Sequence, residues 1–78
     1  MLNEHDRVVL TESIPGSALE AGDVGSVIFV HDGARGFEVE FVSLDGKTST
    51  VVELEAKQVR PVAEREIPHA RLLVTSSS

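Results

Sequence analysis

Three glutamates are spaced so that their carboxylates could act together on one face of a β-sheet. Glu38 and Glu40 lie two residues apart in an alternating segment, so both side chains point to the same side of an extended strand. Glu53 falls at an outward position on the next expected strand. Such a group could act as general acids and bases, hold a cation, dock a basic partner or form a solvated face. Because a flat sheet face offers no pocket for a small substrate, docking is the favoured functional interpretation.

The histidines His5, His31 and His69 are the other side chains able to titrate near neutral pH. His31 and Asp32 stand at the expected end of an apolar strand, but one imidazole and one carboxylate are too few ligands for a closed metal site. We therefore interpret His31 as an exposed strand-end residue and Asp32 as a turn residue. His69 would matter only if the C-terminal segment folds back. We predict no metal and no cofactor.

Two features argue against an enzyme. The chain has no cysteine and no Gly-x-Ser-x-Gly motif, so it lacks two common arrangements of a nucleophile. Gly22 and Gly25 invite comparison with a phosphate-binding loop, but a strand-like segment follows them where such a loop needs a helix. We instead predict positive φ at Gly22, a bulge or close backbone approach at Gly25, and no catalytic residue.

The net charge of −6 is unevenly distributed along the chain. Residues 1–55 hold 11 acids and 3 bases, a net of −8, whereas residues 56–78 hold 2 acids and 4 bases, a net of +2. This balance argues against non-specific nucleic-acid binding, in which Lys and Arg neutralise phosphates. The chain also has no Trp and no Tyr, so neither a proline-rich peptide groove nor a base-stacking platform is expected.

The basic residues of the C-terminal part support an alternative. They lie close together in sequence and could form a strip that contacts phosphates. This alternative is a nucleic-acid or ribosome-associated module whose contacts are Lys57, Arg60, Arg65 and Arg71.

The apolar patterning predicts five short strands and an all-β fold. The clearest alternation puts Phe37, Val39 and Phe41 inward, and we expect Thr50, Val52 and Leu54 to point inward on the following strand. The segment 24–31 is apolar on both faces, with Val24, Ile28 and Val30 on one and Val27 and Phe29 on the other, and Ser26 marks a bend. The expected strands are 7–11, 24–31, 37–41, 48–54 and 59–62.

Turn signals separate these strands. Pro15-Gly16 lies in a loop that we expect to hold one helical turn at residues 17–21, Asp45-Gly46 forms a tight hairpin, and residues 55–58 form a turn of 3₁₀ helix. Pro61 cannot donate a ladder hydrogen bond, so the last strand should lie at an edge. We divide the chain into a barrel, residues 1–63, and an extension, residues 64–78, that ends in disordered serines.

The extension contains Leu72, Leu73 and Val74, which are too apolar to be left in water. We expect them to add a strand to the barrel or to a neighbouring molecule, and the second arrangement would give a homodimer. The N-terminal residues have no signal-peptide pattern, and no segment approaches the roughly 20 apolar residues of a membrane span. A cytoplasmic location is therefore expected.

This order of elements describes a five-stranded SH3-like barrel, and the glycine-centred strand is similar to that of KOW domains. The chain from Asp6 to Val62, 57 of 78 residues, resembles a small bacterial family, domain-of-unknown-function family 4926. No activity is established for that family, so the resemblance implies none for this chain. The matching stretches are Asp6-Arg7-Val8-Val9-Leu10-Thr11, Ala21-Gly22-Asp23-Val24-Gly25-Ser26-Val27, Glu38-Val39-Glu40-Phe41, Asp45-Gly46 and Val59-Arg60-Pro61-Val62.

The sequence therefore predicts an acidic, non-catalytic protein-interaction module. Its partner would be a basic protein that docks against Glu38, Glu40 and Glu53. A concrete form of this hypothesis is an antitoxin-like or immunity-like inhibitor whose acids occlude a basic active site.

Overall fold

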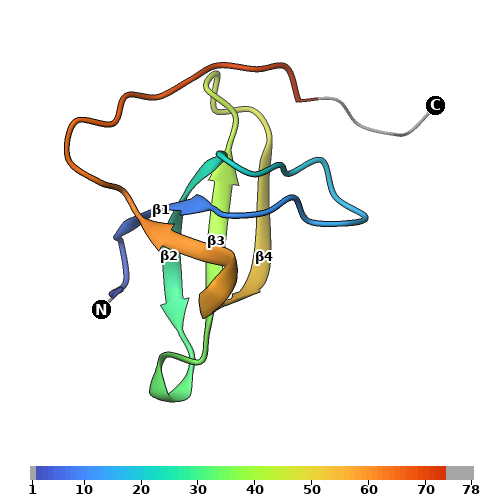
Figure 1. The fold of residues 1–78 in the computed structure, drawn as a ribbon. Coiled ribbons are helices and arrows are strands. Elements are labelled where there is room, and N and C mark those ends of the chain that lie inside the picture. The colour runs from blue at the N-terminus through green and yellow to red at the C-terminus, as the bar shows by residue number, and fades with distance from the viewer. Residues whose placement is uncertain (1, 74–78) are drawn as a thin grey trace.

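A computed structural model describes residues 2–73 of the protein (Figure 1). Two 3₁₀ helices accompany the strands, η1 (Asp32–Ala34) and η2 (Ala56–Gln58). No helix among the described residues is long and apolar enough to cross a membrane. The five strands are β1 (Arg7–Leu10), β2 (Val24–Val30), β3 (Gly36–Val42), β4 (Ser49–Glu55) and β5 (Val59–Pro61).

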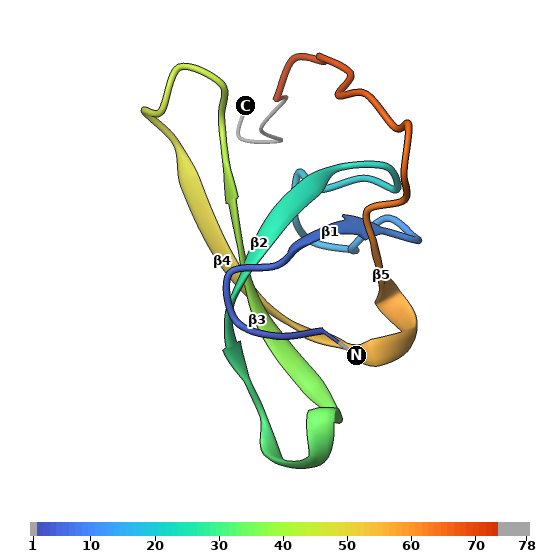
Figure 2. The ribbon, with the colours of Figure 1, turned by 90° about the vertical axis from the view of Figure 1, so that its left-hand side faces the viewer.

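The strands form one antiparallel sheet in the order β4-β3-β2-β1-β5, which confirms the all-β prediction and its five strands. Figure 2 shows the sheet curling so that β1 and β5 lie across from the β3–β4 hairpin. The barrel is not closed, however, because β4 and β5 pair only with β3 and β1. The three-residue β5 ends at Pro61, which has no N–H to donate, so it cannot extend the ladder around to β4.

The core fills the concave side of the curled sheet. The predicted alternation of β3 is confirmed, since Phe37, Val39 and Phe41 are buried whereas Glu38 and Glu40 remain partly accessible. Burial of these side chains supplies the main driving force for folding in a chain without disulfides. The remaining members of the core cluster are Val8, Leu10, Leu19, Val27, Leu54 and Val59.

Gly25 on β2 sits where no side chain would fit. A Cβ atom there would lie 2.7 Å from Cγ1 of Val39, 2.8 Å from Cε2 of Phe41 and 2.9 Å from the backbone oxygen of Glu40. The predicted close approach at Gly25 is therefore confirmed. Gly22 has φ 95°, as predicted for the turn that leads into the strand.

The irregularity of β2 lies further along the strand than predicted. The register with β3 shifts between Val27 and Phe29, so Ile28 rather than Ser26 marks the bulge. An extra residue reverses the alternation, and for this reason Phe29 is half exposed whereas Val27 is buried. The prediction that Val27 and Phe29 share a face was wrong, because the period-two argument assumed an uninterrupted ladder.

Two further local predictions were wrong. Thr50 on β4 pairs with Phe41 and so lies on the core side of the hairpin, but it is exposed near the turn at residues 43–48, so the expectation that it would be buried there was wrong. Residues 17–21 form turns and no helix; the Ser17 hydroxyl accepts a hydrogen bond from the Leu19 N–H at 3.1 Å without starting one. Val52 and Leu54 do contact the core, as expected.

The predicted hairpin turn at Asp45-Gly46 and the predicted 3₁₀ turn within residues 55–58 are confirmed. Gly46 has φ 76°, and Asp45 accepts hydrogen bonds from the Ser43 hydroxyl at 2.6 Å and from the Lys47 N–H at 3.0 Å. These hydrogen bonds, the one from Ser43 first, lower the pKa of the Asp45 carboxyl. Residues 56–58 form η2, directly before β5.

The C-terminal segment forms no strand within residues 64–73, so the expected sixth strand is absent from the described part of the chain. Leu72 is 85% exposed, contrary to the expectation that its apolar side chain would be covered. Val74 and the final serines lie outside the described residues.

Candidate functional site

The outward face of β3 and β4 carries the three glutamates singled out in the sequence. The β3–β4 register sets Glu38 directly opposite Glu53 and Glu40 opposite Val51. All three carboxylates therefore lie on one face of the hairpin, as predicted. Like charges opposite each other in an antiparallel pair repel, so this arrangement carries a local cost in stability.

His31 joins this group from the end of β2. Its Nε2 atom lies 3.3 Å from Oε2 of Glu38 and 3.7 Å from Oε2 of Glu53. Nε2 is shielded from solvent and has no hydrogen-bond partner among the described residues, since the contact with Glu38 lacks hydrogen-bonding geometry.

The face also presents apolar surface. The ring of Phe29 packs edge-on against His31, with centroids 5.0 Å apart and planes at 77°. Phe29 is 47% exposed, and Val51 and Val42 on the same face are exposed to a similar extent. Carboxylates beside half-exposed apolar side chains provide both charge and apolar area for a docking partner.

A hollow opens beside His31 where the β2–β3 hairpin meets η2. Among its lining residues are Arg35, Glu53, Glu55 and Gln58. Within residues 2–73 no group of three or more acidic or histidine side chains is placed to hold a metal ion. Glu38 and Glu53 both approach the same nitrogen of His31 instead of converging on a vacant position.

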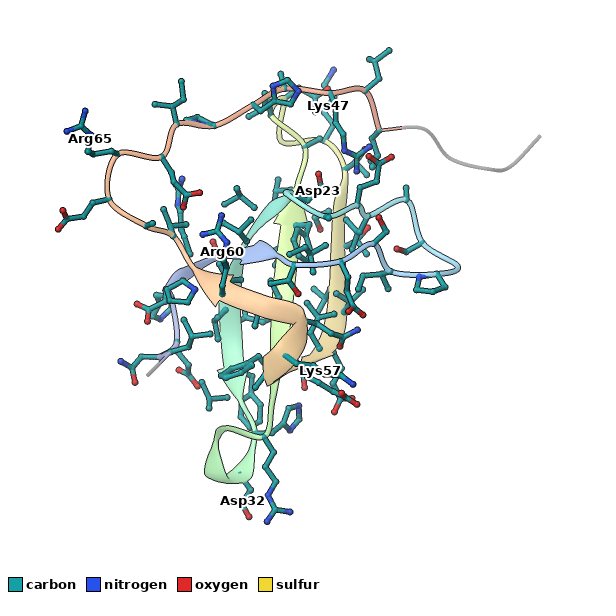
Figure 3. All side chains as sticks on the ribbon, viewed as in Figure 1. Asp23, Asp32, Lys47, Lys57, Arg60 and Arg65 are labelled. Carbon is teal, nitrogen blue, oxygen red and sulfur yellow. The ribbon has the colours of Figure 1, made fainter. Side chains whose placement is uncertain are left out.

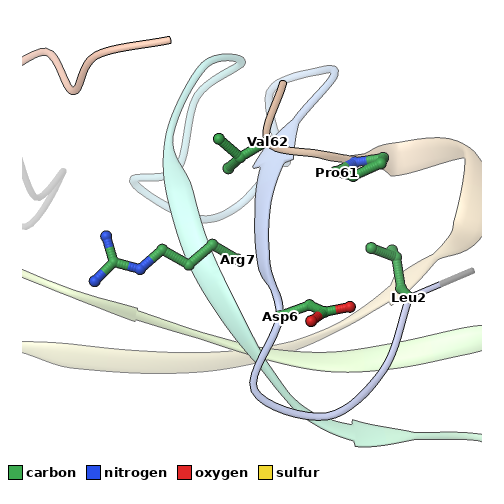
Figure 4. A pocket seen from close by; sticks show the side chains of 5 residues that line it. All are labelled: Leu2, Asp6, Arg7, Pro61 and Val62. Atoms are coloured by element: carbon green, nitrogen blue, oxygen red, sulfur yellow. The ribbon is translucent and has the colours of Figure 1, made fainter. Parts of the chain in front are cut away.

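A second hollow, of about 340 Å³, lies between the N-terminal segment and β5 (Figure 4). Leu2, Pro61 and Val62 give it apolar walls, and Asp6 and Arg7 lie at its sides. Asp6 already accepts a hydrogen bond from the Asn3 N–H at 2.8 Å, so its carboxylate serves the local turn.

Two of the four basic candidates are engaged in bidentate ion pairs with the domain's own acids. Arg60 donates two hydrogen bonds to Glu66, at 3.0 and 2.6 Å. Hydrogen bonds from Arg60 and from the Ala63 N–H lower the pKa of the Glu66 carboxyl to about 2. A bidentate pair of this kind occupies the guanidinium that would otherwise contact a phosphate.

Arg71 is held more completely. It donates to both carboxylate oxygens of Asp23, at 2.9 and 2.5 Å, and to the carbonyl oxygen of Ala18 at 2.7 Å. Its side chain is 25% exposed, and Glu20 adds a carboxylate oxygen 3.6 Å away. Partial burial opposes ionisation of Asp23, but the hydrogen bonds from Arg71 and from the Glu20 N–H prevail and lower its pKa.

The other two basic residues lie apart from each other. Figure 3 places Lys57 at η2 and Arg65 on an outward bend of the C-terminal segment, with Arg60 between them. Lys57 lies 3.6 Å from Glu55, and no ion pair is found for Arg65 within residues 2–73. The described structure therefore does not gather the four bases into one free strip.

The participation of His31 was missed in the sequence, where it was interpreted as an exposed strand-end residue. Its side chain is partly buried against Phe29, Glu38 and Glu53. The pairing of β2 with β3 is the feature that could have indicated this role of His31. The residue immediately after β2 lies opposite Gly36, and the Glu38–Glu53 pair is close to that position. The bulge at Ile28, which was not foreseen, sets that register.

Comparison of the chain with models of known protein families gives a match. The model of a family described as a domain of unknown function (DUF4926) matches residues 4–61. The chain belongs to this family. Neither the curated proteins nor the solved structures contain a match to the chain.

The DUF4926 match covers all five strands and both 3₁₀ helices. It contains the acidic face and His31, together with Lys57 and Arg60. Arg65 and Arg71 lie beyond it, in the segment that the Arg71–Asp23 pair ties back to the domain.

Proposed function

We propose that the chain is a non-catalytic module that binds one basic protein through the outward face of β3 and β4. The supporting observation is the grouping of Glu38, Glu40 and Glu53 on one face beside the half-exposed Phe29 and Val51. This face belongs to the part of the chain that carries a net charge of −8.

The physical basis is charge complementarity. Cations of the partner would relieve the repulsion between Glu38 and Glu53 as they bind, and the acidic surroundings would speed encounter. Phe29 and Val51 would supply the apolar part of the contact. An antitoxin-like or immunity-like inhibitor, acting in the cytoplasm on the basic active site of its partner, fits this chemistry.

The nucleic-acid alternative is less favoured by the side-chain contacts. Arg60 and Arg71 are paired with Glu66 and Asp23, so using them on phosphates would first require breaking bidentate ion pairs. A mobility-shift assay with short RNA at low salt, where phosphate contacts are strongest, tests this alternative directly. A shift that is lost in a Lys57→Gln/Arg65→Gln variant would support it over the protein partner.

The test of the proposed function compares two variants of equal net charge. Glu38→Gln/Glu40→Gln removes two charges from the face, whereas Glu4→Gln/Glu64→Gln removes two exposed charges elsewhere. Proteins of the native host retained by the immobilised wild-type chain would be purified, and their affinity for each variant measured by calorimetry. We expect a basic protein whose affinity falls at least about tenfold with the first variant and is unchanged with the second.

Two results would contradict the proposal. One is that no purified host protein binds the wild-type chain. The other is that both variants weaken binding equally, which would show a dependence on overall charge rather than on this face.

A further inference from the structure

Strand β4 presents an open edge of backbone hydrogen-bonding groups. Among residues 2–73 it pairs with β3 alone, and the Ser43 N–H donates to the Thr48 carbonyl at 2.8 Å where this ladder begins. In an antiparallel ladder the backbone groups of successive residues alternate between the partner strand and the opposite side. The groups of Thr50, Val52 and Leu54 therefore face β3. Those that face away from it belong to Ser49, Val51 and Glu53.

The two edges of the sheet are protected very differently. The β5 edge is three residues long and ends at Pro61. The β4 edge is seven residues long and contains neither Pro nor Lys, and Val51 in it is 49% exposed. Natural proteins shorten, charge or cover such edges because an uncovered one recruits another strand. The β4 edge therefore has the features of an interface.

We propose that two copies of the chain pair antiparallel through β4, about a two-fold axis that passes beside Val51. A two-fold axis normal to the sheet makes one residue face its own copy, and Val51 is the middle one of the three residues Ser49, Val51 and Glu53 whose backbone groups point outward. With Val51 on the axis, the two Val51 residues exchange both backbone hydrogen bonds. The backbone groups of Ser49 in each copy then exchange hydrogen bonds with those of Glu53 in the other copy.

The charges of β4 are compatible with this register. With Val51 on the axis, Glu53 of each copy lies opposite Ser49 of the other, and Glu55, the last residue of β4, lies across from the turn that carries Lys47 of the other copy. A shift that centres the pair on Glu53 would instead set the two Glu53 carboxylates opposite each other. Opposite charges across strands stabilise a pair and like charges destabilise it, so the Val51 register keeps the like charges of β4 apart.

The pairing would extend the sheet continuously across the two copies. Because the axis is normal to the sheet, the carboxylate faces of both copies lie on the same side. Glu53 of each copy would remain on that face, beside Ser49 of the other. We infer the dimer from the unpaired edge of β4, from the direction of its backbone groups and from the positions of its charged residues. The inference does not depend on whether the acidic face binds a basic protein.

Sedimentation velocity of the full chain tests the dimer between about 1 μM and about 1 mM. We expect the average mass to rise from monomer towards dimer across this range. Val51→Lys places two like charges at the axis and should raise the dimer Kd at least about tenfold. Val42→Lys is the matched control, since Val42 is 50% exposed on the same face but belongs to β3, and it should leave the Kd unchanged.

Exchanging the charges tests the register. Glu55→Lys alone and Lys47→Glu alone should each weaken the dimer, whereas the double variant should restore it because the opposite charges face each other again. The proposal is overturned if the wild-type chain stays monomeric throughout the range. It is also overturned if Val51→Lys leaves the dimer intact, or if Leu72→Ser/Leu73→Ser abolishes it, which would place the interface in the C-terminal segment.

Discussion

At the scale of single residues, the most informative arrangement is the cross-strand pair of Glu38 and Glu53. Two carboxylates opposite each other repel, and within residues 2–73 neither carboxylate has an ion pair with a lysine or an arginine. His31 lies between them with one nitrogen turned to both. Residues placed at a cost to stability are often retained for binding, because the partner later relieves that cost.

Glu53→Gln is therefore expected to stabilise the fold by about 0.5 kcal/mol, since it removes one of two facing like charges. Urea unfolding at neutral pH measures this change. Glu4→Gln removes an exposed charge with no cross-strand acid and serves as the control, for which we expect no change. A destabilised Glu53→Gln chain would show instead that the carboxylate contributes favourable contacts to the free protein.

Gly25 shows that a single backbone position can be fixed by packing. Gly25→Ala would force its new methyl group against Val39, Phe41 and the backbone of β3, and we expect a loss of about 1–3 kcal/mol. Gly22→Ala measures the effect of backbone strain alone, because Gly22 has φ 95° and open space around it. We expect this variant to lose about 1 kcal/mol of the free energy of unfolding. Thermal or urea unfolding ranks the two variants, and an equal loss in both would argue against the steric account.

At the scale of elements, the C-terminal segment acts as a strap although it forms no strand. Arg71 reaches Asp23 across 48 positions of sequence and holds residues 64–73 against the loop before β2. Arg60 and Glu66 secure the start of the same segment. Ion pairs rather than apolar packing hold it, which explains why Leu72 stays in solvent.

Arg71→Lys should release this strap, because an ammonium group cannot make the bidentate contact with Asp23 together with the bond to Ala18. Limited proteolysis of residues 64–73 should accelerate several-fold, whereas Arg65→Lys, at a position without an ion pair in the described residues, should not change it. The free energy of unfolding of the sheet itself should change by less than about 1 kcal/mol. Equal cleavage of Arg71→Lys and wild type would show that the strap is already open in solution.

Acid should release the start of the strap within a defined range of pH. The Glu66 carboxyl has its pKa lowered from 4.5 to about 2, so its contribution to stability is complete above pH 4.5 and is lost as the pH falls towards 2. The Ala63 amide, which donates to Glu66 at 2.6 Å, reports this titration in ¹⁵N NMR spectra. A midpoint near 4.5 instead of near 2 would mean that the ion pair with Arg60 does not form in solution.

At the scale of the whole molecule, the two parts of the chain carry net charges of opposite sign. The acidic residues 1–55 form four of the five strands, and the basic remainder supplies β5 and the strap. Three of the four basic residues in that remainder lie within ion-pair distance of acids of the molecule, which leaves the outward face of β3 and β4 as the concentrated charge. Salt should therefore act on folding and on partner binding in opposite directions.

Raising the salt concentration from about 0.02 to about 0.2 M should stabilise the free protein by a few tenths of a kcal/mol, because it screens the repulsion among the acids. The same change should weaken binding of a basic partner. Urea unfolding and calorimetry measure the two effects, and Glu38→Gln/Glu40→Gln should reduce both. A free protein that loses stability with salt would show that its ion pairs outweigh the repulsion.

The features that depend on a few neighbouring residues could be predicted from the sequence alone. The alternation of residues 37–41, the Asp45-Gly46 turn and the edge position of Pro61 each follow from local backbone and burial rules, so all five strands could be placed. The grouping of Glu38, Glu40 and Glu53 on one face followed from the same period of two.

Features that depend on strand register and on contacts between distant segments became visible in the folded molecule alone. A single extra residue at Ile28 turns Phe29 outward and brings His31 between Glu38 and Glu53, and no local pattern marks where that bulge falls. The same limit applies to the pairing of Arg71 with Asp23 and to the gap between β4 and β5. Those outcomes depend on how far the sheet curls and where the chain returns, and both are set by packing of the whole molecule.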